Sequence, residues 1–210
     1  MGVERYKRKR RGVETRKRVR FVFISAEGKN KTETNYLRGF GAKSVQLKFV
    51  SGGNTDPVRM SEDLIQKMKD DGFESGLGDR AYCLVDGDVA PYKDKQIKDA
   101  EKLAAKHGFQ IIFSNPCFEV WFLCHYCLSK KQFDKSADVV DELKKYLPQY
   151  AKSLPNMKGV LSGELSTAVG NAKKLDKWNL GLGRKKHTSE FQPCSEVYQL
   201  IEESFPDQIG

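Results

Sequence analysis

The chain has no long hydrophobic run. Among its 210 residues no uninterrupted apolar stretch approaches the roughly 18 residues that a membrane-spanning helix needs. The first residues are rich in arginine and no apolar core follows them directly, so we expect no secretory signal. These absences argue against a membrane protein and against a secreted one, and they favour a cytoplasmic protein without a membrane partner.

The chain also lacks the cysteine pattern of a disulfide-rich or zinc-binding protein. Its five cysteines are an odd number without regular spacing, which favours reduced thiols in the cytoplasm. Cys124 and Cys127 form a single C-x-x-C pair around His125 inside an apolar segment, with no second pair elsewhere. Buried free cysteines behave as small apolar residues, so zinc is a minor alternative here and His125 is interpreted as a core histidine.

Most of the chain has almost no net charge. The formal charge is +9, yet residues 1–20 hold ten of the 37 Lys and Arg and only two Glu. We therefore expect residues 1–18 to be a basic, disordered arm on a nearly neutral body, able to contact nucleic-acid phosphates. The alternative is an arm that only improves solubility. The predicted contacts are Arg8, Arg10, Arg11, Arg16, Lys17 and Arg18, joined by Lys29 and Lys31 from a later loop.

Short apolar runs alternate with helical patterns along the body. Strands are expected at 19–26, 44–50, 81–85 and 109–113. Helices are expected at 32–40, from Pro57 with Asp56 as N-cap, and at 93–107, 117–128, 133–146, 163–178 and 195–204. This alternation predicts an α/β fold in which helices flank a mostly parallel sheet of about four strands. Residues 19–128 would form this core, and 129–210 a helical C-terminal region packed on it.

Three carboxylates follow predicted strands. Glu27 ends the first strand, and Asp86 and Asp88 end the third. Ligands of open parallel sheets bind beyond the carboxyl ends of the strands, so we expect these side chains to meet there. Clustered carboxylates repel unless a cation separates them, and oxygen ligands suit Mg²⁺ or Mn²⁺. Such an ion can activate a phosphodiester and its attacking water. The alternative is that these residues only form turns or cap a helix.

Five segments together resemble the RloB family. In order they are ISAEGKNKTETNYLRGF, VSGGNTDP, LVDGDVAPY, SNPCFEVWFLCHY and QPCSEVYQLIEE. The resemblance spans about residues 19–204, and NPCFEVW is its most specific part. RloB proteins are a Toprim-like group encoded in bacterial restriction or abortive-infection loci, often beside an ATPase. The resemblance therefore implies a Toprim-like core and a role in antiphage defence, with an ATPase as a possible partner.

The resemblance also implies an acidic nuclease site. It assigns Glu27 as general acid/base and metal ligand, and Asp86 and Asp88 as ligands of Mg²⁺ or Mn²⁺, for cleavage of RNA or DNA phosphodiesters. Two departures concern the first loop: EGKNKTE is one residue longer than the commoner form, and Ala26 replaces a frequent Cys. Glu33 accordingly has two interpretations. It is either catalytic, completing the metal shell, or it lies in a first helical turn, where negative charge is favourable.

Other interpretations remain open. Glu119 lies in an apolar segment and must be paired or belong to a site; we favour a structural role, for instance with an arginine. Residues 181–187 (GLGRKKH) are expected to form a flexible basic loop. LVDGDVA also fits the opening motif of haloacid-dehalogenase-like phosphatases, but no later acidic pair supports that class. A Toprim fold that binds nucleic acid or an ATPase without cutting is the main alternative, and the sequence leaves homo-oligomerisation open.

Overall fold

The computed structural model describes residues 18–27, 32–51, 53–152, 154–161 and 165–209. The predicted phosphate contacts of the arm up to Lys17, and those of Lys29 and Lys31, lie outside these residues. Within the described part, no helix has the length and apolar character needed to cross a membrane.

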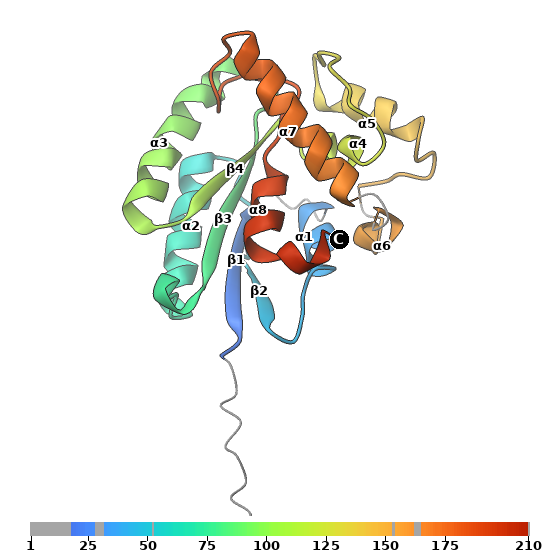
Figure 1. Cartoon of the computed structure of the whole chain (residues 1–210). Helices are drawn as coiled ribbons and strands as arrows, with labels where there is room; N and C mark the ends of the chain where they lie inside the picture. The colour runs from blue at the N-terminus through green and yellow to red at the C-terminus, as the bar shows by residue number, and fades with distance from the viewer. Residues whose placement is uncertain (1–17, 28–31, 52, 153, 162–164, 210) are drawn as a thin grey trace, which may run out of the picture.

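The sheet has five strands in the order β2-β1-β3-β4-β5 (Figure 1). Its first four strands are parallel, as the sequence predicted, and β5 pairs antiparallel to β4. The fifth strand was not expected, because two residues are too few to produce a strand-like alternation. The strands are β1 (Arg20–Ala26), β2 (Val45–Phe49), β3 (Arg80–Asp86), β4 (Gln110–Asn115) and β5 (Cys194–Ser195).

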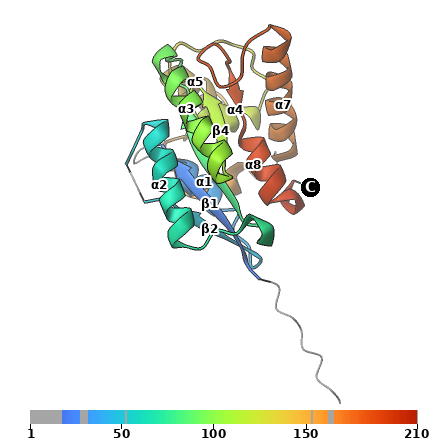
Figure 2. The ribbon, with the colours of Figure 1, turned by 90° about the vertical axis from the view of Figure 1, so that its left-hand side faces the viewer.

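Helices cover both faces of the sheet. Helices α2 and α3 lie together on one face, as the view in Figure 2 shows, and the remaining helices cover the other. The helices are α1 (Thr32–Arg38), α2 (Pro57–Asp70), α3 (Pro91–His107), α4 (Glu119–Cys124), α5 (Ser136–Lys144), α6 (Met157–Leu161), α7 (Leu165–Gly181) and α8 (Val197–Ser204). The mixed α/β class with a helical C-terminal region is therefore confirmed.

The alternation of side chains along the strands explains the two cores. In β1, Val22 and Ile24 pack with the larger helical layer, whereas Phe23 between them packs against α2. In β3, Tyr82 and Leu84 point to the first core and Cys83 to the second. A parallel strand covered on both faces needs apolar residues at every position, which is why these runs are continuous in the sequence.

Two helices show how local sequence determines their ends. Asp56 caps α2 by accepting hydrogen bonds from the amides of Val58 (3.1 Å) and Arg59 (3.0 Å), with Pro57 as the first helical residue. This confirms the predicted start. Helix α4 is shorter than the predicted 117–128, because the residues around it form i to i+3 turns, as in the bond from His125 N to Phe122 O.

The prediction of a flexible basic loop at 181–187 is wrong. Arg184 donates to Asn179 Oδ1 (2.8 Å) and to the carbonyl of Gln192 (2.6 Å). Lys186 Nζ lies 2.9 Å from both Asp176 and Glu196. These partners come from helix α7 and from the chain around β5, so the ion pairs that fix the loop form only when these segments pack together.

Candidate functional site

The parallel register brings the predicted acids to one edge of the sheet. Ala26 in β1 pairs with Leu84 in β3, so Glu27 lies beside the end of β3. The amide of Asp86 donates to Glu27 Oε2 at 3.3 Å. Asp88 follows two residues later, and Lys93 links it to Glu27. The structure thus places Glu27, Asp86 and Asp88 together at the carboxyl ends of β1 and β3.

A lysine that the sequence reasoning did not single out lies among these acids. The ammonium of Lys93 is 3.1 and 3.2 Å from the two carboxylate oxygens of Glu27 and 2.7 Å from Asp88 Oδ2. It also donates to the carbonyl of Asp86 at 3.0 Å. Lys93 comes from the first turn of α3 and is only 5% exposed. Its position shortly after D-G-D was the only available signal.

The turn that carries the aspartates is held by the end of β4. Gly87 N donates to Ser114 O and Asp88 N to Pro116 O, both at 2.8 Å. Asp88 and Val89 both have positive φ, 51° and 54°, a conformation that non-glycine residues seldom adopt. These hydrogen bonds therefore fix a strained turn, and with it the direction of the Asp88 side chain.

Asn115 connects this turn to the loop before β5. Its Oδ1 accepts from Val89 N at 3.1 Å. Its Nδ2 donates to the carbonyls of Thr188 (3.4 Å), Ser189 (3.0 Å) and Phe191 (3.3 Å). The side chain is fully buried, so one amide satisfies backbone groups on both sides of the site.

Two further carboxylates, Glu33 and Glu119, extend the acidic cluster. Both are buried, Glu33 in the first turn of α1 and Glu119 in the first turn of α4. Glu119 accepts from the Tyr150 hydroxyl at 2.9 Å and lies 3.7 Å from Lys152 Nζ, so its partners are a tyrosine and a lysine, not the arginine that we expected. Among the described residues, Glu33 Oε2 has no hydrogen-bond partner.

Burial and crowding raise the pKa values of three of these acids. Burial, then the charges of Glu119 and Glu27, raise the pKa of Glu33 to about 8. The pKa of Asp86 is raised well above its ordinary value by its enclosure and by Glu33, Glu27 and Glu119. Burial also raises the pKa of Glu27, although Lys93 opposes it. These three carboxyls therefore keep their protons up to a higher pH than ordinary carboxyls do.

Lys93 itself remains a cation. Burial alone would lower its pKa, but its hydrogen bond to Asp88 and the charge of Glu27 outweigh burial and raise it. The candidate site is therefore an acidic cluster of Glu27, Glu33, Asp86, Asp88 and Glu119 that contains one buried positive charge.

The donor chemistry of the cluster fits a hard divalent cation, because every donor is a carboxylate oxygen and Glu33 Oε2 is buried without a partner. In the described part of the chain, however, no group of three or more His, Cys, Asp or Glu is arranged to hold a metal ion. The cation that joins Glu27 to Asp88 is Lys93. The binding of Mg²⁺ or Mn²⁺ stays a prediction.

Two other candidate residues, Arg18 and His125, lie outside the acidic cluster. Arg18, a predicted phosphate contact, forms an ion pair with the buried Asp79 (3.3 Å) and lies over the ring of Phe21. His125 is buried against Trp121, and burial lowers its pKa to about 4, so it is neutral at pH 7. Both residues have structural partners in the described part of the chain.

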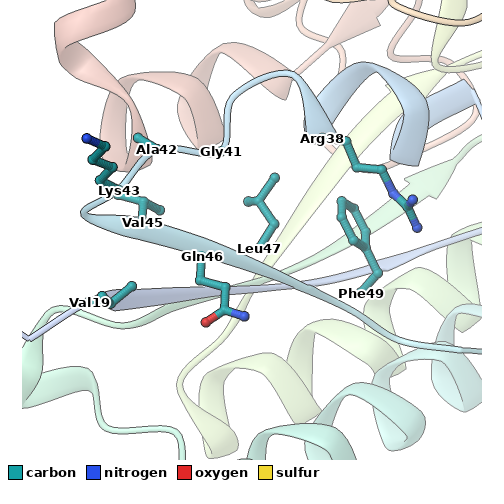
Figure 3. A pocket seen from close by; sticks show the side chains of 9 residues that line it. All are labelled: Val19, Arg38, Gly41, Ala42, Lys43, Val45, Gln46, Leu47 and Phe49. Atoms are coloured by element: carbon teal, nitrogen blue, oxygen red, sulfur yellow. The ribbon is translucent and has the colours of Figure 1, made fainter.

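One pocket lies apart from the acids. It is an open groove of about 780 Å³ beside the edge strand β2, lined among others by Arg38, Leu47 and Phe49 (Figure 3). None of its lining residues belongs to the acidic cluster. The acidic cluster and this groove are therefore separate features of the described surface.

One comparison identifies relatives of the chain. The family described as RloB-like protein matches residues 22–203, a segment that includes all five acids and Lys93. No curated protein and no solved structure matches. Since the match covers most of the sequence, the chain belongs to the RloB-like protein family.

Proposed function

We propose that this protein is a divalent-metal-dependent nuclease of the Toprim type that cleaves RNA or DNA phosphodiesters in antiphage defence, in the cytoplasm. The observation that carries the proposal is the crowding of five carboxylates at and beside the carboxyl ends of β1 and β3. Burial and neighbouring charges raise the pKa values of three of them, Glu27, Glu33 and Asp86. Titratable groups perturbed in this way are typical of functional sites. Membership of the RloB-like family supports the same assignment.

Each residue of the site has a proposed task. Asp86, Asp88 and Glu27 would hold Mg²⁺ or Mn²⁺, with Glu33 completing the set. The bound ion would supply charge stabilisation and a more acidic water. Glu27 acts as general acid/base, because a carboxyl with a raised pKa exchanges protons more readily near neutral pH. Lys93 orients Glu27 through both carboxylate oxygens. The basic arm attracts the nucleic acid.

The test is cleavage of RNA and DNA by the purified full chain with Mn²⁺. We expect Glu27→Gln to reduce cleavage by at least about 100-fold, the usual contribution of acid/base catalysis. Asp86→Asn should also reduce cleavage strongly, because it removes a proposed metal ligand. Glu62→Gln serves as the matched control, because Glu62 is an exposed acid of α2. If the Glu27 and Asp86 variants cleave as fast as the control, the proposal is wrong.

One observation favours a second candidate, a module that binds nucleic acid or a partner ATPase without cutting. Lys93, a protein side chain, already bridges Glu27 and Asp88, and a bridged pair needs no metal. For this candidate, calorimetric titration with Mn²⁺ gives no heat, Asp86→Asn retains defence against phage, and the chain co-purifies with its ATPase. Metal-dependent cleavage that is lost in Asp86→Asn excludes it.

A further inference from the structure

Lys93 satisfies two of the acids almost completely. Both oxygens of Glu27 accept from its ammonium, and Glu27 Oε2 also accepts from Asp86 N. Asp88 Oδ2 accepts from Lys93, while Asp88 Oδ1 accepts from the hydroxyl of Ser136 at 3.3 Å. Every carboxylate oxygen of Glu27 and Asp88 therefore has a hydrogen-bond donor within the described structure.

Glu33 differs from this pair. Among the described residues no donor reaches the buried Oε2 of Glu33. Lys93 contacts the backbone carbonyl of Asp86 and not its carboxylate. The side chains of Asp86 and Glu33 are also close enough to interact electrostatically. The cluster thus contains a satisfied pair, Glu27 and Asp88, and one acid, Glu33, with an oxygen that has no partner among the described residues.

The position of Lys93 is costly for a residue with only a structural role. The first turn of a helix repels positive charge, and Lys93 lies in the first turn of the 17-residue helix α3. It is also nearly buried, and a buried ammonium is tolerated only when it is paired. The carboxylates offset both costs, so the ammonium and the acids stabilise one another.

We propose that Lys93 is a tethered cation that occupies the place of a metal ion between Glu27 and Asp88, so that it weakens the binding of a divalent ion by these acids. A divalent ion between Glu27 and Asp88 would displace the ammonium from four oxygens at 2.7–3.2 Å. Glu33 Oε2, by contrast, accepts no hydrogen bond from the described residues. This inference rests on the metal dependence of the proposed function.

The test measures Mn²⁺ binding by calorimetry and by the shift of the thermal unfolding midpoint. Lys93→Met removes the charge but keeps a similar apolar stem. We expect it to lower the midpoint without metal and to bind Mn²⁺ about tenfold more tightly, since repulsion between close charges is strong at a partly buried site. Lys93→Arg keeps the charge and should bind Mn²⁺ as the wild type does.

Lys95→Met is the matched control, because Lys95 is an exposed lysine of the same helix. It should leave both the midpoint and Mn²⁺ binding unchanged. If Lys93→Met is unfolded without metal, Mn²⁺ should restore its folding. Equal Mn²⁺ affinity in Lys93→Met and wild type, no Mn²⁺ binding by either, or a Lys93→Met protein that Mn²⁺ does not refold would each overturn the inference.

Neither Mn²⁺ calorimetry nor the thermal midpoint depends on cleavage. The nuclease proposal and the tethered-cation proposal can therefore be rejected independently. Tighter Mn²⁺ binding by Lys93→Met in a protein that cuts no nucleic acid supports the tethered cation and rejects the nuclease. Metal-dependent cleavage with unchanged Mn²⁺ affinity in Lys93→Met supports the nuclease and rejects the tethered cation.

Discussion

Gly87 lies so close to Asn115 that a β-carbon at position 87 would clash with Asn115 Oδ1. A methyl group added to Gly87 would lie 2.6 Å from this oxygen and 2.8 Å from the ring of Phe113. The glycine of D-G-D is therefore needed for close packing against β4. The same contact makes the geometry of the acidic cluster depend on the end of the neighbouring strand.

We expect Gly87→Ala to destabilise the protein, because neither Asn115 nor Phe113 can move freely in the core. Overpacking of this kind typically costs about 1–3 kcal/mol, which urea unfolding can measure. Gly170→Ala is the control: Gly170 lies within α7 with no atom near the added methyl group. That change should stabilise the helix slightly. Similar effects of the two substitutions would contradict the packing argument.

Asn115 supports the aspartate turn through hydrogen bonds on both sides. Asn115→Asp keeps the size and the acceptor for Val89 N but replaces the donor to three backbone carbonyls with an oxygen. We expect a loss of roughly 1–3 kcal/mol in the free energy of unfolding, the usual cost of leaving buried polar groups unsatisfied. Hydrogen exchange should show faster opening at Val89 and Ser189. Unchanged exchange at both amides would refute this role.

His187 lies between two glutamates and makes stability depend on pH. Its Nδ1 is 2.6 Å from Glu101 and its Nε2 is 2.8 Å from Glu196. Burial opposes protonation, but the hydrogen bond and charge of Glu196, followed by those of Glu101, raise the pKa of His187 above 6.5. The stabilisation is complete below pH 6.5 and is lost as the pH rises through the folded-state pKa.

The measurement is urea unfolding of the wild type and His187→Asn from about pH 6 to about pH 9. Asn tolerates the positive φ of 58° at this position, so the variant removes the titration without adding backbone strain. Wild-type stability should decline over this range more steeply than that of the variant. Parallel pH profiles would show that His187 contributes no such linkage.

The buried His125 should make the folded protein less stable as the pH falls, whereas His187 makes it less stable as the pH rises. The pKa of His125 is lowered to about 4 by burial, against 6.5 in the unfolded chain. The unfolded state therefore binds the proton first as the pH falls from 6.5 to 4, and the folded state loses up to roughly 3 kcal/mol. His125→Phe, which keeps a ring beside Trp121, should shift acid unfolding to lower pH. An unchanged acid midpoint would contradict this account.

The fold could be predicted from the sequence because its main signals are local. The apolar runs of β1 and β3 depend only on burial on both faces, and Asp56-Pro57 determines the start of α2 within a few residues. The strand-end acids could be placed together for a similar reason, since parallel strands end at one edge. These inferences need no knowledge of how distant segments pack.

What the sequence did not predict depends on such packing. Lys93 meets Glu27 only after the first turn of α3 comes to the end of β1, across 66 residues of chain. Glu119 accepts a hydrogen bond from Tyr150, which is 31 residues away. The two carboxylates that pair with Lys186 come from two other segments. A charged residue in isolation looks solvent-exposed, so its buried partners become evident only in three dimensions.

The contribution of the basic arm to binding can be tested on its own. Residues 1–17 hold eight Lys and Arg, whereas Arg18 already pairs with Asp79. Replacing residues 2–17 with a Gly/Ser segment of equal length should therefore leave the unfolding midpoint unchanged. It should weaken nucleic-acid binding. The magnitude of the slope of log affinity against log salt should fall by about 0.7–0.9 for each phosphate that the arm neutralises in the wild type. Cleavage at saturating substrate should persist, because the acids are intact; an unchanged salt slope would mean that the arm does not bind nucleic acid.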